Sequence, residues 1–204
     1  MKDYRATETD IFPSEKDINS HKDEVLKGHR TPNHYSFIHE RGSHANKEFR
    51  KAFNNKCAYC GVNELINSVQ LFEVDHYICQ SSTKLSVDFD NFDNLINSCY
   101  ECNRHKSGLD INDDYLEILN PKSNIQNIFT RSKDFDIIIN TKYKSDDYIL
   151  DFYKKMKFNH NLRRLDFLIL SIIDLESNTN NQEIKDKLIV LIEKLKQKRN
   201  KMII

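Results

Sequence analysis

The chain has 204 residues, and its 31 lysines and arginines balance its 31 aspartates and glutamates. A formal net charge of zero excludes a protein whose whole surface is basic, so any binding of a polyanion must rest on a local patch or on a metal. Hydrophobic residues make up 38% of the chain, which is enough for a core. The chain has only four glycines and three prolines, which are too few for the many tight turns of a β-sandwich or β-barrel. We therefore expect helices joined by polar loops.

The first forty residues are polar and show no sustained hydrophobic period. We interpret residues 1–42 as an irregular N-terminal arm with one short helix near residues 20–27. They also lack the apolar core of a signal peptide, and the most apolar later stretch is broken by Asp166, Ser171 and Asp174. The sequence therefore predicts a cytoplasmic protein with no membrane-spanning segment.

The segment before the first pair of cysteines is predicted to be helical. Ser43 is a good N-cap, and apolar residues follow at helical spacing up to Phe53, so a short helix is expected there. Residues 43–110 are interpreted as one module that carries the chemistry.

The C-terminal region, residues 111–204, is expected to be mainly helical. Residues 128–143 alternate around a polar turn and predict a small β-hairpin. Two apolar stripes at helical spacing then predict a pair of helices, around residues 162–172 and 184–195, separated by a polar loop. Such stripes are more often core than partner surface, although period alone does not distinguish the two.

Four of the five cysteines form two Cys-x-x-Cys pairs, Cys57 with Cys60 and Cys99 with Cys102. In a chain that is not secreted, this pattern favours a metal over disulfides. Four thiolates satisfy tetrahedral Zn²⁺ and leave no position open for substrate, so we predict a structural zinc site that folds residues 61–98 back on themselves. The alternative is two unrelated thiol pairs or a redox motif. The fifth cysteine, Cys79, is expected to be a small buried side chain.

A group of polar residues lies between the cysteine pairs and directly after the second pair. An alternating segment ends in Asp75 and His76, Asn94 precedes the second pair, and the second pair opens a predicted helix that carries Asn103 and Lys106. We expect these side chains to come together if zinc holds a strand, a loop, a second strand and a helix in one unit. Alone, each of them is more often a surface, turn or cap residue.

In this order the motifs resemble the HNH endonuclease family, which cuts phosphodiesters with a ββα-metal fold and one divalent cation. The resemblance covers residues 57–108. Asn103 stands where the family has its last histidine, which makes this an HNN variant. The fold class we expect is therefore α+β, with a small ββα-metal module braced by a four-cysteine zinc site and a mainly helical C-terminal extension.

The resemblance assigns roles to these positions. It implies that His76 is the general base, that Asp75 and Asn103 hold catalytic Mg²⁺ or Mn²⁺, and that the amide of Asn94 pins the loop near His76. Lys106, on the same helix face as Asn103, is expected to contact a substrate phosphate.

Three further features near these positions are open to an ordinary structural interpretation. His105 is a candidate for contact with nucleic acid. Glu73 shares a strand face with Asp75 and supports the metal site or is simply solvated. His29, His34, His39 and His44 recur every five residues, which matches neither a helix nor a strand face, so we interpret that spacing as coincidence.

The downstream order has a looser resemblance to the HNH subunits that partner an ATPase in Septu-type anti-phage systems, and to HNH proteins found with some retrons. That resemblance implies an ATPase subunit as partner and a docking role for the C-terminal helices. Arg163, Arg164 and the basic residues at 194–201 are candidates for contact with nucleic acid, although a solvated helix face is the commoner explanation.

The leading hypothesis is a zinc-braced, metal-dependent endonuclease acting on DNA or RNA. A second hypothesis, from a different class, is a zinc-held module that binds nucleic acid without cutting, to which the missing third histidine points. A third is a subunit whose main task is to bind a partner.

Overall fold

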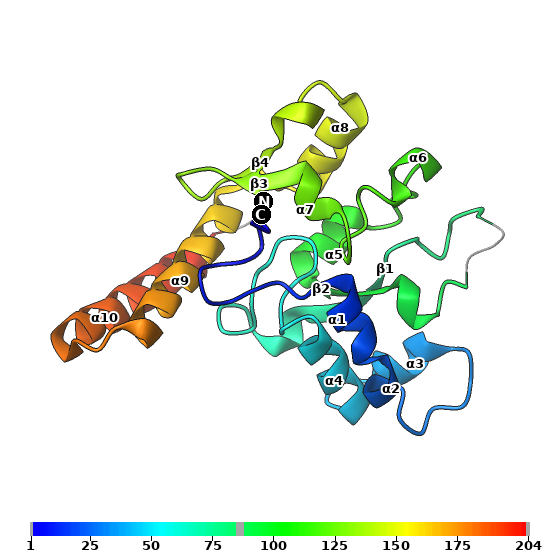
Figure 1. The fold of residues 1–204 in the computed structure, drawn as a ribbon, viewed down its shortest axis with the longest axis horizontal. Helices are drawn as coiled ribbons and strands as arrows, with labels where there is room; N and C mark the ends of the chain where they lie inside the picture. Colours follow the sequence, from blue (N-terminus) through cyan, green and yellow to red (C-terminus); the bar gives the residue numbers. More distant parts are fainter. Residues whose placement is uncertain (1, 85–87, 203–204) are drawn as a thin grey trace.

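The computed structural model describes residues 2–84 and 88–202 and has the expected α+β architecture, with two small antiparallel sheets and a helical C-terminal part (Figure 1). The strands are β1 (Phe72–His76), β2 (Leu95–Cys99), β3 (Phe129–Arg131) and β4 (Ile137–Ile139). The α-helices are α1 (Glu15–Ser20), α2 (Lys22–Val25), α3 (His34–Ile38), α4 (His44–Ala52), α5 (Tyr100–Lys106), α6 (Asp113–Leu116), α7 (Ile125–Ile128), α8 (Asp147–Lys155), α9 (Asn161–Asn178) and α10 (Gln182–Arg199). Short 3₁₀ turns cover Val69–Leu71, Phe92–Asn94 and Thr141–Tyr143.

Strands β1 and β2 and helix α5 form the centre of the molecule. The strands are antiparallel, with Phe72 opposite Cys99 and His76 opposite Leu95. Helix α5 begins directly after β2 and contacts both strands. Every residue of β2 is buried, because α5 and the segment that starts at Lys56 cover it. The two strands and the helix therefore form a fixed frame on which the polar residues of β1 and α5 face each other.

The N-terminal arm is more ordered than the sequence predicted. Three short helices, α1 to α3, replace the single short helix that was expected, and each buries one apolar residue, Ile18, Val25 or Ile38, in the main core. Two of these helices begin at a side-chain cap, Ser14 with its capping box for α1 and Asn33 for α3. In so polar a stretch, these caps are the main sequence signal that helices start there.

Helix α4 and the β3–β4 hairpin agree with the predictions from sequence. Ser43 caps α4 by accepting a hydrogen bond from the backbone of Asn46. In the hairpin, Phe129 pairs with Ile139 and Arg131 pairs with Ile137.

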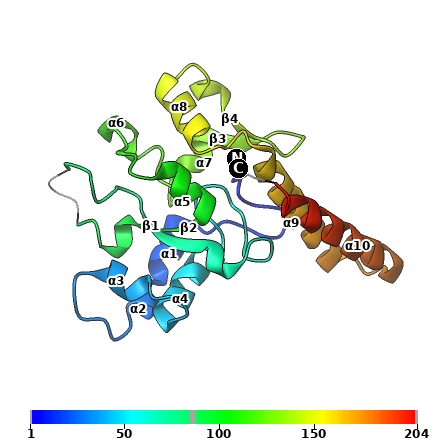
Figure 2. The ribbon, with the colours of Figure 1, turned by 180° about the vertical axis from the view of Figure 1, so that it is seen from behind.

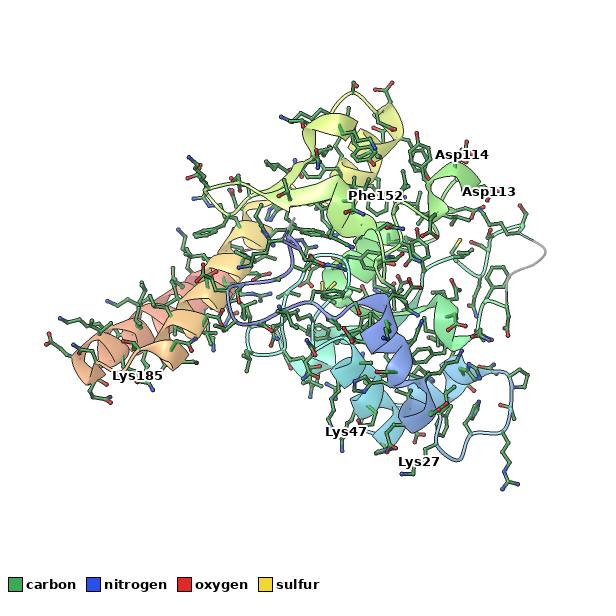
Figure 3. The ribbon with its side chains drawn as sticks, in the orientation of Figure 1. Lys27, Lys47, Asp113, Asp114, Phe152 and Lys185 are labelled. Atoms are coloured by element: carbon green, nitrogen blue, oxygen red, sulfur yellow. The ribbon has the colours of Figure 1, made fainter. Side chains whose placement is uncertain are left out.

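The two predicted C-terminal helices, α9 and α10, pack on each other as an antiparallel pair that projects from the rest of the molecule in both views (Figures 1 and 2). Their own apolar cluster is small and centres on Leu165, Ile169 and Ile192, whereas the main core belongs to the body of the protein. Lys185, on α10, lies toward the free end of this helical hairpin (Figure 3). Among the described residues, the model contains no helix that is both long and apolar enough to cross a membrane.

Candidate active site and metal centre

Four cysteine sulfurs meet at one point beneath the central sheet. Cys57, Cys60, Cys99 and Cys102 are all buried, and their Sγ atoms all lie within 4.8 Å of one another. The Sγ atoms of Cys60 and Cys99 are 3.8 Å apart. Four sulfurs at ~2.3 Å from a tetrahedral zinc ion are separated by about 3.8 Å, whereas a disulfide bond needs about 2 Å. The cluster therefore fits a structural zinc site. No other cluster of three or more metal-ligating His, Cys, Asp or Glu side chains occurs in the described part of the chain.

The local fold explains how the sulfurs are brought together. The chain turns sharply after Cys60 because Gly61 has a φ of 79°, and the amide of Gly61 donates to the carbonyl of Cys57. On the other side, Cys99 ends β2 as the N-cap of α5, and Cys102 lies in the first turn of that helix. Each cysteine pair therefore comes from a tight turn, and the sheet brings the two turns together.

The surroundings of the sulfurs act in opposite directions on the individual thiols. Burial acts to raise the pKa of Cys60, but hydrogen bonds from the other three cysteines and the charge of Arg163 bring that pKa well below the ordinary value. Burial raises the pKa values of Cys99 and Cys102. Zinc binds the deprotonated form of all its cysteine ligands, so the metal supplies the stabilisation that burial opposes.

Asp75 points from β1 toward α5 and is buried. Its Oδ2 accepts a hydrogen bond of 2.7 Å from the hydroxyl of Tyr59, and its Oδ1 lies 3.0 Å from Nζ of Lys106. Lys106 is itself 1% exposed, and its Nζ also donates to the carbonyl of His76 at 2.6 Å. Burial raises the pKa of Asp75, although Lys106 and the hydrogen bond from Tyr59 act in the opposite direction.

Asn103 lies one turn of α5 before Lys106 and faces Glu73 instead of Asp75. Its Nδ2 donates to Oε2 of Glu73 at 2.6 Å, and the other oxygen of Glu73 lies 3.0 Å from Nη2 of Arg104. These three residues line a recess of about 240 Å³, whose wall also includes Tyr35 and His39. Three oxygen-bearing side chains, from Glu73, Asp75 and Asn103, thus lie between β1 and α5, and carboxylate and amide oxygens are the donors that Mg²⁺ and Mn²⁺ prefer.

His76 is the next residue on β1, so its ring points to the opposite face of the strand from Asp75. Its Nε2 lies 2.9 Å from Oδ1 of Asp90, and its ring packs against Tyr35 with the centroids 4.4 Å apart. Only 12% of the side chain is exposed. No hydrogen bond joins the ring to Asp75 or Asn103 in the described part of the molecule, but Tyr35 lines the recess that contains Asn103, so His76 lies directly behind that wall.

Asn94 holds the loop that connects the two strands. Its Oδ1 accepts from the backbone amide of Ile78 at 2.8 Å, and its Nδ2 donates to the carbonyls of Ile78 and Phe89 at 3.0 and 2.9 Å. The backbone of Tyr77, next to His76, donates to the carbonyl of Asn94. This single amide therefore fixes both ends of the segment that follows His76.

His105 lies on the other side of α5 from Asn103 and lines a groove of about 670 Å³ together with Tyr100, Arg104 and Leu162. Burial lowers the pKa of His105. Two exposed side chains share this groove: Tyr100 is 45% exposed, and the guanidinium of Arg104 lies 4.9 Å from the centroid of its ring.

Two of the basic residues proposed from sequence for contact with nucleic acid are not available for it. Arg163 is 2% exposed and Arg199 is 9% exposed, so that expectation was wrong for both. Arg163 turns inward to the cysteine cluster, and Arg199 turns inward to Asp166. Arg164, by contrast, is about half exposed.

The other unassigned residues have structural surroundings. Cys79 is buried, as expected, beside Ser81. The evenly spaced histidines make separate contacts: His34 accepts from the backbone of Phe92, and His44 lies 2.9 Å from Glu24.

Residues 57–108 match the family model of HNH endonucleases. The comparison with curated proteins and the comparison with solved structures gave no match. The HNH domain thus contains the two strands, the helix, all four cysteines and every polar residue described between them, and it indicates a nuclease.

Several residues of the HNH domain and its surroundings were not foreseen from sequence. Asp90 and Tyr35 hold the His76 ring, and Tyr59 holds Asp75. Tyr59 stands between the two cysteines of the first pair, so the zinc site itself brings its hydroxyl to Asp75. Asp90 and Tyr35 lie in a loop and in the N-terminal arm, where no local pattern connects them to β1.

Proposed function

We propose that this protein is a metal-dependent endonuclease that hydrolyses phosphodiester bonds in DNA or RNA. The observation that carries the proposal is the opposition of β1 and α5 inside the HNH domain. Asp75, Glu73 and Asn103 lie between these elements, and the ring of His76 stands at the end of the same strand on its other face, against Tyr35. Such a site needs an activated water, a cation beside the scissile phosphate and a fixed geometry between them.

In this proposal His76 is the general base. The carboxylate of Asp90 only accepts hydrogen bonds, so the hydrogen bond between them puts the proton on Nε2 of His76. Nδ1 is then left with the lone pair that can accept a proton from water. Asp90 and the ring of Tyr35 hold the imidazole in one orientation, and Asn94 fixes the backbone that follows it.

Asp75 and Asn103 are the residues we propose to hold the catalytic cation, Mg²⁺ or Mn²⁺, with Glu73 beside them. A bound divalent cation would supply Lewis-acid stabilisation of the charge that develops on the phosphate and the leaving oxygen. Both oxygens of Asp75 already have partners, so Lys106 must release Oδ1 to make room. The released ammonium would then be free to contact a phosphate, as proposed for Lys106 from the sequence.

The substrate would approach along α5. Arg104 is 60% exposed and shares the groove with Tyr100 and His105. An exposed cation on an aromatic ring can contact both the phosphate and the face of a base, which suits a nucleic-acid strand without requiring a particular sequence.

We further propose that the protein is the nuclease subunit of an anti-phage system and acts with an ATPase partner. The support for a partner is the α9–α10 hairpin, where five large apolar residues are 41–56% exposed: Leu175, Ile184, Ile189, Val190 and Leu191. Exposed apolar side chains on a projecting element are typical of an interaction surface. Co-expression with an ATPase subunit should give a complex that aspartate substitutions at Val190 and Leu191 disrupt.

Cleavage assays test the nuclease proposal directly. Purified protein is incubated with plasmid DNA and with RNA, in Mg²⁺ or Mn²⁺, beside His76→Ala and the control His44→Ala, whose histidine is exposed and lies 2.9 Å from Glu24. We expect His76→Ala to lose activity by roughly 10²–10⁴-fold, in the range of general-base contributions, and His44→Ala to retain it. Equal cleavage by all three proteins would overturn the proposal.

The same proteins separate the competing function. A module that binds nucleic acid without cutting would shift labelled DNA or RNA in a gel whether or not His76 is present, and no divalent cation would produce cleavage. Binding with no cleavage under any condition would favour that alternative.

A further inference from the structure

Arg163, in the first turn of α9, is the one basic side chain in the described part of the chain that donates to the cysteine sulfurs. Its Nη1 lies 3.3 Å from Sγ of Cys60 and 3.8 Å from Sγ of Cys99. The side chain is buried, and its Nε and Nη2 have no hydrogen-bond partner among the described residues. Among the described residues, the hydrogen-bond partners of this guanidinium are therefore the sulfurs that we assign to zinc.

A buried guanidinium in this position requires a negative partner. Arginine stays protonated in proteins, and a buried charge without a partner is strongly destabilising. Neutral thiols do not supply a compensating charge, whereas Zn²⁺ with four thiolates carries a net charge of about −2. The metal cluster and Arg163 thus stabilise each other.

The charges continue from Arg163 along the helical hairpin. Asp166, one turn further on α9, is buried, and its Oδ1 lies 2.6 Å from Nε of Arg199 at the end of α10. The sign of the charge alternates from the thiolates through Arg163 and Asp166 to Arg199. The buried pair of Asp166 and Arg199 thus joins the two helices one turn away from the contact between Arg163 and the cysteine cluster.

The N-terminal arm also attaches the hairpin to the body, because Thr7 and Thr9 donate hydrogen bonds to the carboxylate of Asp174 on α9. The apolar cluster between α9 and α10 is small, with three buried members among the described residues, Leu165, Ile169 and Ile192, and the hairpin projects away from the main core (Figure 1). At the base of the hairpin, Arg131 of β3 donates to the carbonyl of Arg163 and reaches the carbonyl of Cys60. The same short region therefore joins the cysteine cluster, the β-hairpin and α9.

We propose that zinc in the four-cysteine site controls the docking of the α9–α10 hairpin onto the HNH domain, and that Arg163 is the positioning residue that links them. With zinc bound, the thiolates hold Arg163 and fix the base of the hairpin. Without zinc, the sulfur cluster holds less negative charge beside Arg163, and the base of α9 is held less firmly. This role is independent of whether the HNH domain cleaves nucleic acid.

Zinc release and hydrogen exchange test this link without using activity. The zinc-loaded full chain is compared with Arg163→Met, which keeps the length of the side chain without its charge, with Arg163→Lys, and with Arg164→Met as the matched control on the exposed neighbour. We expect a competing chelator to remove zinc from Arg163→Met about 10–100-fold faster than from the wild type, the range seen when a residue supporting a metal ligand is lost. Arg163→Lys should fall between the two, and Arg164→Met should match the wild type.

Hydrogen exchange in excess zinc then reports the position of the hairpin. Peptides from α9 and α10 of Arg163→Met should exchange faster than those of the wild type, while β1 and β2 keep their protection. A wild-type rate of zinc release from Arg163→Met, or unchanged protection of α9 and α10 in that variant, would overturn the proposal.

If Arg163→Met cannot be purified folded, two other measurements decide. Asp166→Asn leaves Arg163 in place and breaks only the connection to Arg199, so exchange should rise at the end of α10 while zinc release stays at the wild-type rate. For the wild type, graded removal of zinc should release protection in α9 and α10 in proportion to the metal lost. Hairpin protection that is independent of zinc occupancy would refute the link.

Discussion

Nζ of Lys106 lies 3.0 Å from Oδ1 of Asp75, and both side chains are almost completely buried. Each is in the position of a proposed functional group, Asp75 as a cation ligand and Lys106 as a phosphate contact. In this structure they neutralise each other. Lys106 therefore serves as the counter-charge of Asp75 and competes with a divalent cation for the same oxygen.

Replacing Lys106 with Met should make the protein depend on a divalent cation for stability. Losing one partner of a buried ion pair costs about 3–5 kcal/mol, and Asp75 then lacks a counter-charge. We expect a lower free energy of unfolding in EDTA and a larger recovery with Mn²⁺ than the wild type shows. Urea unfolding with and without Mn²⁺ measures both effects. The control is Lys51→Met, which removes an exposed lysine from its ion pair with Glu48. Its free energy of unfolding is expected to change by less than about 1 kcal/mol. An equal response to Mn²⁺ in all three proteins would exclude competition at Asp75.

Asp90 is expected to select the tautomer of His76, because it accepts the hydrogen bond from one ring nitrogen. In Asp90→Asn, the amide can donate to Nε2, which would move the proton to Nδ1 and remove the proposed base. We expect cleavage to fall by roughly 10²-fold or more, while the binding of nucleic acid is unchanged, because correct tautomer selection is part of general-base catalysis. Asp88→Asn is the control, since Asp88 lies in the same loop and contacts Asn91. Full activity of Asp90→Asn would show that another group orients His76.

Gly61 is required by both its backbone conformation and its surroundings. Its φ is 79°, and a Cβ at this position would lie 2.8 Å from the Cα and Cβ of Arg5. Gly61→Ala should therefore lower the free energy of unfolding by about 2–4 kcal/mol, from the left-handed conformation plus the steric conflict, and accelerate zinc loss. Gly42→Ala separates the two causes, because Gly42 has a φ of 80° with nothing within 4 Å. Equal destabilisation of the two variants in urea would mean that the contact with Arg5 has no effect.

The sequence was most informative where chemistry depends on spacing. Two Cys-x-x-Cys pairs were enough to predict a shared metal site, because each pair can be presented by one tight turn. Ser43 predicted the start of α4 through its capping bond to Asn46. In both cases the informative spacing is local, within each cysteine pair and within the cap, so the pattern is visible without the fold even though the two pairs are far apart in the chain.

The sequence was least informative where partners are far apart in the chain. Arg163 and Arg164 form a dibasic pair that is typical of a solvated helix face, and only the docking of α9 decides that one of them is buried against Cys60. The N-terminal arm was expected to be irregular, yet Arg5 is 1% exposed because its guanidinium donates to the carbonyls of Ala58 and Pro121. No local period encodes such contacts, since a polar side chain is buried only when distant carbonyls or charges accept its hydrogen bonds.

Lys122 should give the protein an unusual gain of stability at alkaline pH. Its Nζ is buried and donates to the carbonyls of Phe92 and Asp93 at 2.9 and 3.0 Å, with no carboxylate in contact among the described residues. Burial lowers the pKa of this lysine to about 8. In the unfolded chain the ordinary pKa is about 10.4. Between these two values the unfolded state holds one proton more than the folded state, so the free energy of unfolding rises with pH.

The contribution of Lys122 can be isolated by comparing the wild type with Lys122→Met in urea from pH 7 to pH 10. The difference between the two proteins should change in favour of the wild type by up to about 3 kcal/mol over this range, because one pKa unit corresponds to about 1.4 kcal/mol. It should be flat below pH 7, where Lys122 is protonated in both states. Lys47→Met, at an exposed position on α4 (Figure 3), should follow the wild type throughout. Parallel curves for the wild type and Lys122→Met would mean that Lys122 keeps an ordinary pKa in the folded protein, despite its burial against two carbonyls.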